Sequence, residues 1–252
     1  MKISIITVCY NSSKFIRSAI ESVITQSYAN IEYIIIDGGS SDNTLDIVNQ
    51  YRDKIAHVVS ELDNGIYDAM NKGIEIASGD IIGILNSDDF YATNDVIQQV
   101  ATVFSAPGVD ACYADLIYVD PIQTNKIIRY WRSRIFKPGL FKWGWMPAHP
   151  TFFARKSCFT ELGNYDLNYH LQADFELTMR FLEVFRINAV YIPEIWIKMR
   201  MGGASNRSLT NVFKGNLEAY RACKKNRIGI SPLFNVFKIM SRLPQFILRP
   251  RQ

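Results

Sequence analysis

The sequence predicts an α/β fold in which a Rossmann-like, mostly parallel central sheet is flanked by helices. Short apolar runs, typical of strands buried on both faces, alternate with segments whose apolar residues recur at helical spacing. Two of these runs, 34–36 and 81–85, stop at the acidic segments DGGSSD (37–42) and NSDD (86–89). Ligands bind outside the carboxyl ends of parallel strands, so these acids predict a site for a nucleotide and a hard metal ion.

The first 85 residues predict a regular alternation of strands and helices. We expect strands at 3–8, 31–36, 56–59 and 81–85, and helices at about 12–26, 41–51 and 65–79. Ser12 or Ser13 can cap the first helix, and Gly79 can close the third. Such alternation implies right-handed crossovers and a parallel sheet.

The second half of the chain is less regular. We expect helices near 95–104, 156–162 and 174–184, and strands at 111–119, 126–131 and 189–192. An aromatic loop region rich in Trp, Pro and Gly separates them at about 136–150.

Composition bounds the class of protein. With 252 residues, 48% apolar and 21% charged, the chain has the make-up of an ordinary globular protein that can bury a full core. Its four cysteines form no Cys-x-x-Cys pair, which favours reduced thiols in a cytoplasmic protein. The sequence predicts neither a signal peptide before the first strand nor an apolar stretch of the roughly 18 residues that a membrane span needs.

The charge is unevenly distributed. Residues 207–252 hold ten Lys and Arg and one acid, Glu218, for a formal charge of +9, whereas residues 1–206 sum to −5. We therefore divide the chain into a catalytic domain, 1–206, and a basic amphipathic helical extension, 207–252. A uniformly basic nucleic-acid binder would not show this division, so no nucleic-acid partner is expected.

The acids at the two strand ends have structural alternatives. Asp88 and Asp89 could hold Mg²⁺ or Mn²⁺ and a ribose, or they could cap a helix or form an Asx-turn. Asp37 could accept a hydrogen bond from a nucleotide base, or it could cap the glycine-rich turn that follows it.

Four blocks together resemble the signature blocks of glycosyltransferase family 2. They are TVCYN (7–11), DGGSSD (37–42), DNGIYDAMNKG (63–73) and LNSDD (85–89). The resemblance covers about residues 3–205. It implies a GT-A fold, a nucleoside diphosphate-sugar donor, with a UDP-sugar expected, a divalent metal (Mn²⁺ or Mg²⁺), and inversion at the anomeric carbon of the sugar.

The same resemblance implies roles for individual residues. The residues expected to bind the nucleotide-sugar are Thr7, Tyr10 and Asp37 around the base and ribose, Asp63 on the nucleoside side, Asn71 and Lys72 lining the pocket, and Asp88 at the ribose. Asp88 and Asp89 are the expected metal ligands. Two departures from the family pattern are Gly38 and Asn86, where family members often carry an acid.

Three later blocks resemble the acceptor side of the same family: HPTFF (149–153), GNYD (163–166) and ADFEL (173–177). The last implies that Asp174 is the catalytic base. Glu176 points elsewhere on a helix, and Asp166 is the reserve candidate. The alternative for Asp174 is a charged first turn that favours the helix dipole. His149 and Arg200 could reach the diphosphate or the acceptor, or could be a structural histidine and a residue of a surface loop.

The extension should contain a helix that starts at Ser231-Pro232 and ends before Pro244. Asn235, Lys238 and Arg242 form its narrow polar stripe. It could lie on an anionic membrane, or pack on the catalytic body or on a second subunit. The membrane alternative suits a peripheral enzyme at the inner face of the cytoplasmic membrane, with a lipid-linked saccharide acceptor.

The sequence thus favours an inverting glycosyltransferase of bacterial polysaccharide biosynthesis. One alternative is a nucleotidyltransferase, although that class should carry a glycine-rich basic loop after its first strand. The other is a nucleotide-sugar binding or scaffold protein that has lost transfer, against which the joint presence of Asp88, Asp89 and Asp174 argues.

Overall fold

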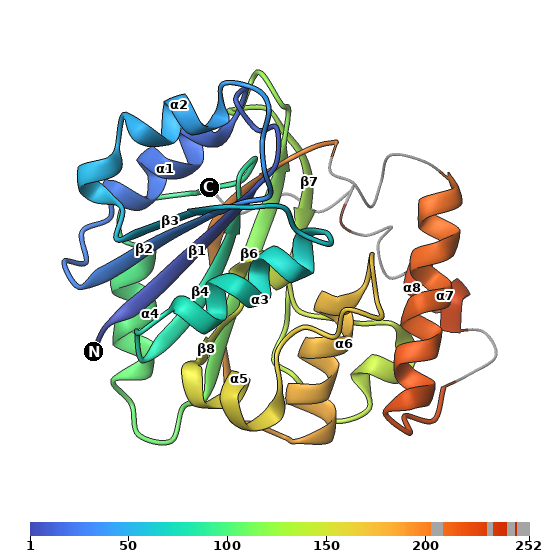
Figure 1. Cartoon of the computed structure of the whole chain (residues 1–252). Coiled ribbons are helices and arrows are strands. Elements are labelled where there is room, and N and C mark those ends of the chain that lie inside the picture. The colour runs from blue at the N-terminus through green and yellow to red at the C-terminus, as the bar shows by residue number, and fades with distance from the viewer. Residues whose placement is uncertain (203–208, 231–233, 241–244, 246–252) are drawn as a thin grey trace.

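A single sheet forms the centre of the computed structural model, which describes residues 1–202, 209–230, 234–240 and 245 (Figure 1). Within these residues the strand order is β3 (His57–Ser60), β2 (Ile31–Asp37), β1 (Ile3–Cys9), β4 (Ile81–Asn86), β8 (Phe153–Arg155), β6 (Ala111–Val119), β9 (Ala189–Arg200) and β5 (Phe90–Tyr91), and β7 (Ile127–Trp131) also pairs with β6.

The first half of the sheet is parallel, as predicted. Strand β1 pairs in parallel with β2 on one side and with β4 on the other, and β2 pairs in parallel with β3. The register sets Cys9 beside Asp37 and Val8 beside Asn86. The two acidic segments therefore start at the same edge of the sheet, which confirms the predicted fold class.

The second half of the sheet is mixed, and the sequence did not predict it well. Strand β8 pairs antiparallel with both β4 and β6, and neither β8 nor β5 was expected. Strand β9 runs parallel to β6 over twelve residues, far beyond the predicted end at Ile192. The strand continues past Pro193 because the register of the β6–β9 pair shifts there. At such an irregularity the strand does not need the backbone N–H that proline lacks.

Helices cover both faces of the sheet (Figure 1). The first face is packed by α1 (Ile16–Ile24), α2 (Thr44–Asn49) and α4 (Val96–Phe104). The second is packed by α3 (Ile66–Ile76), α5 (Lys156–Leu162), α6 (Ala173–Met179) and α7 (Leu209–Lys225). Strand β1 serves both cores, since Ile3 and Ile5 point to the first and Ile6 and Val8 to the second.

Short turns complete the framework. Single 3-10 turns occur at Arg52–Lys54, Leu140–Trp143 and His149–Thr151. A π-helical turn, Arg180–Val184, continues α6 to the end of the helix predicted at 174–184.

The described part of the basic extension packs on the body. Ala219, Ala222 and Cys223 of α7 and Phe234 of α8 (Phe234–Met240) belong to the second core. The ring of Phe237 lies edge-on to Trp143, with centroids 4.7 Å apart. Packing on the body is thus the alternative that the contacts support for α8, while Ser231, Pro232, Arg242 and Pro244 lie outside the described residues.

The polar stripe expected on this helix is wrong at Lys238. Its side chain is buried, whereas Val236 and Met240 are exposed. The ammonium group is accommodated because it donates to Gln172 Oε1 at 2.6 Å and lies over the ring of Phe175.

The cysteines and the helices bear on two expectations drawn from composition. All four cysteines are buried and free. Among the helices of the described ranges, none combines the length and the apolar character that a bilayer-crossing segment requires.

Candidate functional site

A continuous cleft of about 680 Å³ opens at the carboxyl ends of β1 and β4. This volume is within the usual range of small-molecule sites. Six of the residues predicted for the site line the cleft: Tyr10, Asp63, Asp88, His149, Asp174 and Arg200. Residues up to 190 positions apart thus meet in one place, from Tyr10 to Arg200.

Tyr10 and Asp63 form the wall on the predicted nucleoside side. The Tyr10 side chain is 63% exposed, and an aromatic face open to a cleft can stack on a planar base. A Cβ atom added to Gly38 would lie 2.2 Å from Asp63 Oδ2. The carboxylate of Asp63 therefore occupies the space that the second acid of the family pattern would need, which explains why glycine stands at position 38.

Asp37 is not among the residues that line the cleft. Its buried carboxylate accepts hydrogen bonds from Ser40 Oγ (2.5 Å), Ser60 Oγ (2.7 Å) and the Ser40 amide (3.0 Å). Burial raises the pKa of Asp37, but the hydrogen bonds from Ser40 and Ser60 outweigh it and hold the pKa below its usual value. The structure thus uses Asp37 to fix the turn after β2, and its contact with a base stays a prediction.

Three further predicted residues also lie behind the cleft wall rather than on it. Thr7 Oγ1 is buried and accepts a hydrogen bond from Tyr33 at 3.1 Å, because Thr7 points into the first core. Asn71 exchanges hydrogen bonds with the backbone N and O of Tyr165, at 3.0 and 2.9 Å. Lys72 donates to the carbonyl of Leu62 at 2.9 Å. Asn71 thus holds Tyr165, and Lys72 holds the residue before Asp63. Direct contact of these three residues with the nucleotide stays a prediction.

Asp88 is the carboxylate that faces the cleft at the end of β4. The neighbouring Asn86 also lines the cleft, and its buried Oδ1 has no hydrogen-bond partner in the described structure. A carboxylate and an amide oxygen suit Mg²⁺ or Mn²⁺, which take one or two protein carboxylates and complete their shell with substrate phosphates. Within the part of the chain that the structure describes, no three or more His, Cys, Asp or Glu side chains form a group that could hold a metal ion.

The structure favours Asp88 over Asp89 as the carboxylate that could meet a metal, and the role of Asp89 as a metal ligand stays a prediction. Asp89 is fully buried and does not line the cleft. Its Oδ2 accepts from Asn86 Nδ2 at 3.2 Å, and burial, followed by the charge of Asp88, raises its pKa well above the usual value. The other carboxylate oxygen, Oδ1, has no hydrogen-bond partner in the described structure, but so enclosed a group is less accessible to a metal than the cleft-lining Asp88.

Arg200 reaches the same corner from the end of β9. Its Nη1 donates to the backbone carbonyl of Asp88 at 2.7 Å, and its guanidinium lies 4.6 Å from the Phe90 ring centre and 4.9 Å from that of Phe15. Arg200 is the last residue of a strand, and not part of a loop as predicted. It fixes the backbone of Asp88 and adds positive charge to the cleft.

Asp174 stands in the first turn of α6, where two side chains flank its carboxylate. His149 Nδ1 lies 3.1 Å from Asp174 Oδ2, and the Tyr67 hydroxyl donates to Asp174 Oδ1 at 3.3 Å. Burial, and then the charge of Asp174, raise the pKa of Tyr67 well above its usual value, so the phenol keeps its proton and acts as a donor. Asp174 is 13% exposed and His149 27%, so both stay accessible from the cleft.

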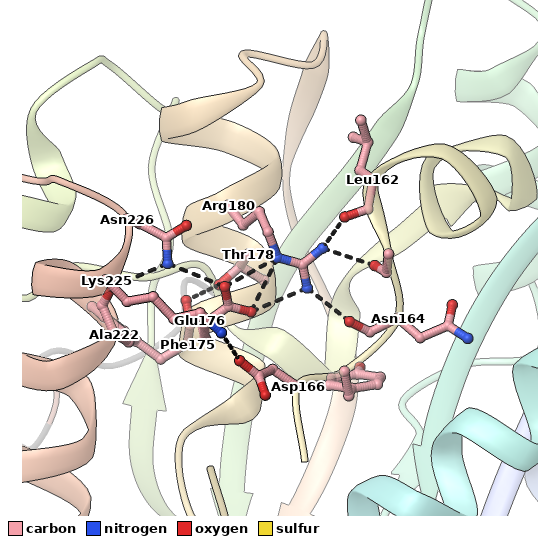
Figure 2. Close-up of polar contacts among 12 residues, drawn as sticks. Leu162, Asn164, Asp166, Phe175, Glu176, Thr178, Arg180, Ala222, Lys225 and Asn226 are labelled. Carbon is pink, nitrogen blue, oxygen red and sulfur yellow. Dashed lines mark hydrogen bonds and ion pairs between the residues drawn. The ribbon is translucent and has the colours of Figure 1, made fainter. Parts of the chain in front are cut away.

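Glu176 points away from the cleft, as expected for a residue two positions after Asp174. Figure 2 shows its carboxylate between Arg180 and Asn226. Arg180 Nε donates to Glu176 Oε1 at 3.0 Å, and Asn226 Nδ2 donates to the same oxygen at 3.1 Å. The reserve candidate Asp166 is likewise engaged, by Lys225 at 2.5 Å. Glu176 thus joins α6 to the end of α7, and Asp166 joins the loop before α6 to α7, so neither acid is placed to accept a substrate proton.

Several cleft residues were missed by the sequence analysis. They are Tyr67, Arg129, Trp131, Tyr165 and four residues of α7. Tyr67 sits inside the DNGIYDAMNKG block, so its position was available, but its partner Asp174 is 107 residues away. Arg129 and Trp131 carry no motif, and only the pairing of β7 with β6 brings them to the cleft.

The sequence of this chain is similar to those of known glycosyltransferases. A model of glycosyl transferase family 2 matches residues 4–163. A PGL/p-HBAD biosynthesis glycosyltransferase of Mycobacterium bovis is 29% identical over 250 residues, covering 98% of this chain and 92% of the relative. An uncharacterized glycosyltransferase of Rickettsia typhi is 30% identical over 233 residues, covering 87% of this chain and 69% of that one.

Solved structures show the same fold. S. aureus TarS 1–349 in complex with UDP superimposes with a TM-score of 0.66 at 19% identity, covering 94% of this chain and 68% of that one. The mannosyltransferase PcManGT of Pyrobaculum calidifontis, in complex with GDP-Man and Mn²⁺, gives a TM-score of 0.66 at 15% identity, with coverages of 96% and 69%. At these identities the likeness concerns the fold, which is GT-A.

Proposed function

We propose that this chain, which belongs to glycosyl transferase family 2, transfers one sugar from a UDP-sugar to a saccharide hydroxyl with inversion. One observation carries the proposal: Tyr10, Asp63 and Asp88 open onto the same cleft as Asp174. A nucleotide-sugar laid along this cleft can therefore present its anomeric carbon to a proton acceptor. TarS, whose fold this chain shares, has been solved with UDP and with UDP-GlcNAc.

The nucleoside would lie between Tyr10 and Asp63, and the diphosphate would lie toward Asp88. A divalent cation, held by Asp88 and by the diphosphate, would neutralise the charge of the leaving group when bound. Lys14 and Arg200 line the same cleft and supply further positive charge.

Asp174 would act as the base at the other side of the sugar. It takes the proton of the acceptor hydroxyl while the hydroxyl oxygen forms a bond to the anomeric carbon. The bond from that carbon to the diphosphate oxygen breaks on the opposite face, and the electron pair leaves with the nucleoside diphosphate. His149 and Tyr67 hold the carboxylate in place from either side.

The test is the substitution Asp174→Asn. Loss of the base should lower transfer by about 10²- to 10⁴-fold, while calorimetry with UDP and Mn²⁺ shows donor affinity within about twofold of the unmodified protein. Asp46→Asn, on the exposed side of α2, is the matched control. Undiminished transfer by Asp174→Asn would refute the assignment of the base, and release of pyrophosphate instead of UDP would favour a nucleotidyltransferase.

A peripheral position at the cytoplasmic face of a membrane, with a role in bacterial polysaccharide synthesis, is the finer part of the proposal. Phe213 is 72% exposed, and Leu217, Lys214 and Arg221 are exposed on the same helix, α7. Apolar and basic side chains on one helix suit an anionic lipid surface. Co-sedimentation with phosphatidylglycerol vesicles should fall at least threefold in Phe213→Asp, and binding that does not change would contradict this position.

A further inference from the structure

Helix α7 of the basic extension forms one wall of the cleft. Asn211, Val212, Gly215 and Asn216 line it, next to His170, Leu171 and Gln172 before α6. Figure 1 shows α6 between the central sheet and α7. The base on α6 is therefore flanked by the nucleotide wall on one side and by α7 on the other.

Small residues bring α7 close to this segment. A Cβ atom on Gly215 would lie 3.4 Å from Gln172 Nε2, so the helix backbone sits directly against that side chain. Ala219 and Ala222 continue the same close face and are fully buried. Larger residues at these positions would widen the gap between α7 and α6.

Glu218, the single acid of the extension, fixes the segment that carries Gln172. Its Oε2 accepts the amide N–H groups of Leu171 (2.8 Å) and Gln172 (3.1 Å), directly before α6 begins. Lys238 of α8 donates to Gln172 Oε1 at 2.6 Å. The extension thus positions Gln172 in the cleft by three hydrogen bonds, two residues before Asp174.

We infer that this wall, made by Gln172, Asn211 and Asn216, binds the acceptor as an uncharged saccharide. The inference rests on the proposed function, in which the acceptor must approach Asp174 from the side opposite the donor's diphosphate. Carboxamide side chains donate and accept hydrogen bonds at once, which matches the hydroxyl groups of a sugar. Among the described residues of 170–172 and α7 that line the cleft, none carries a carboxylate, an ammonium or a guanidinium group, and His170 is the one ionisable side chain. The ammonium of Lys238 lies behind this wall, buried and bonded to Gln172 Oε1, so an anionic sugar would meet no permanently charged cation on the wall itself.

The experiment measures transfer from a UDP-sugar panel to p-nitrophenyl glycosides of neutral hexoses and of glucuronic acid. Asn216→Ala removes one amide from the wall and should raise the KM for the neutral glycoside about tenfold. UDP affinity, and hydrolysis of the UDP-sugar without acceptor, should stay within about twofold. Lys224→Ala, at an exposed position of the same helix, is the control and should leave all three quantities unchanged.

Each result separates the inference from the function on which it rests. An unchanged acceptor KM in Asn216→Ala, or better transfer to the glucuronide than to every neutral glycoside, would overturn the acceptor wall and leave the transferase proposal standing. A protein that binds UDP but transfers to no glycoside of the panel would likewise overturn it. Failure to bind or hydrolyse any nucleotide-sugar would instead remove the proposed function itself.

Discussion

Nδ1 of His149 lies 3.1 Å from Oδ2 of Asp174, although the two residues come from different elements of the fold. His149 begins the 3-10 turn His149–Thr151, and its ring meets Trp131 at an interplanar angle of 73°. The contact does not have the geometry of a hydrogen bond, and Nδ1 makes no hydrogen bond elsewhere in the described structure. The imidazole therefore sets the direction in which the carboxylate of Asp174 faces the cleft.

We first predict that His149→Ala lowers kcat by about 10- to 100-fold. The carboxylate of Asp174 would still be present, but it would be less well oriented toward the acceptor hydroxyl. The affinity for UDP should remain within about twofold. Steady-state kinetics and calorimetry check both. If His149 instead bound the diphosphate, UDP affinity would fall together with kcat.

Substitution by asparagine should affect UDP binding differently at the two adjacent acids after β4. Asp88→Asn should weaken Mn²⁺-dependent UDP binding at least tenfold, because Asp88 faces the cleft. Asp89→Asn should leave that binding within about threefold, since the carboxyl of Asp89 is buried and its pKa is raised by burial and by Asp88. Titration of UDP with and without Mn²⁺ distinguishes the variants, and the reverse order would show that the metal is bound differently.

The close approach of Gly38 to Asp63 predicts that substitutions of these two residues have non-additive effects on UDP affinity. Gly38→Ala should displace the Asp63 carboxylate and lower UDP affinity about tenfold. Asp63→Ala should cost a similar amount, and the double variant should be no worse than Asp63→Ala alone. Fully additive losses would mean that Gly38 contributes to binding independently of Asp63.

Acid stability should depend on Glu32 of β2. Its buried carboxylate accepts from Ser4 Oγ at 2.5 Å and from the Ser78 amide at 2.7 Å. Burial raises the pKa of Glu32, but the hydrogen bonds from Ser4, Ser78 and Lys2 outweigh it and lower the pKa from 4.5 to about 2. Because the pKa is lowered in the folded state, this stabilisation is present above pH 4.5 and is lost as the pH falls toward 2.

Glu32→Gln should therefore lower the free energy of unfolding at pH 7 by about 2 kcal/mol. The difference from the unmodified protein should shrink as the pH falls below 4.5. Urea denaturation at pH 7, 4 and 3 measures it, with the exposed Glu75→Gln as control. A difference that is constant with pH would show that the effect is not due to the charge of Glu32.

The parallel half of the fold could be predicted because its signals are local. Each strand there is a short apolar run, and the neighbouring helices have regular apolar spacing. The strand pairs of the second half could not, since β8 has only three residues and β9 passes through Pro193. Their formation depends on partners far away in the chain.

The candidate site was predictable to the same extent. The sequence motifs identified Tyr10, Asp63, Asp88 and Asp174, and the structure places all four in one cleft. The motifs could not tell which of two adjacent acids faces outward, because that depends on the turn in which the Asp89 amide bonds to the carbonyl of Asn86. Nor could they separate a residue that lines the wall from one that supports it, such as Asn71.

The packing of α7 and α8 into the second core has a practical consequence for work with shortened genes. The family match stops at residue 163, before α6 with its Asp174, and the division by charge falls at 206. A fragment that ends at residue 206 would uncover the apolar surface that Ala219, Ala222 and Phe234 seal, and would release Gln172 from its anchors. A fragment that ends at residue 163 would also lack Gln172 and α6 themselves. Expression trials and diffraction screens should therefore keep the chain through Met240 at least.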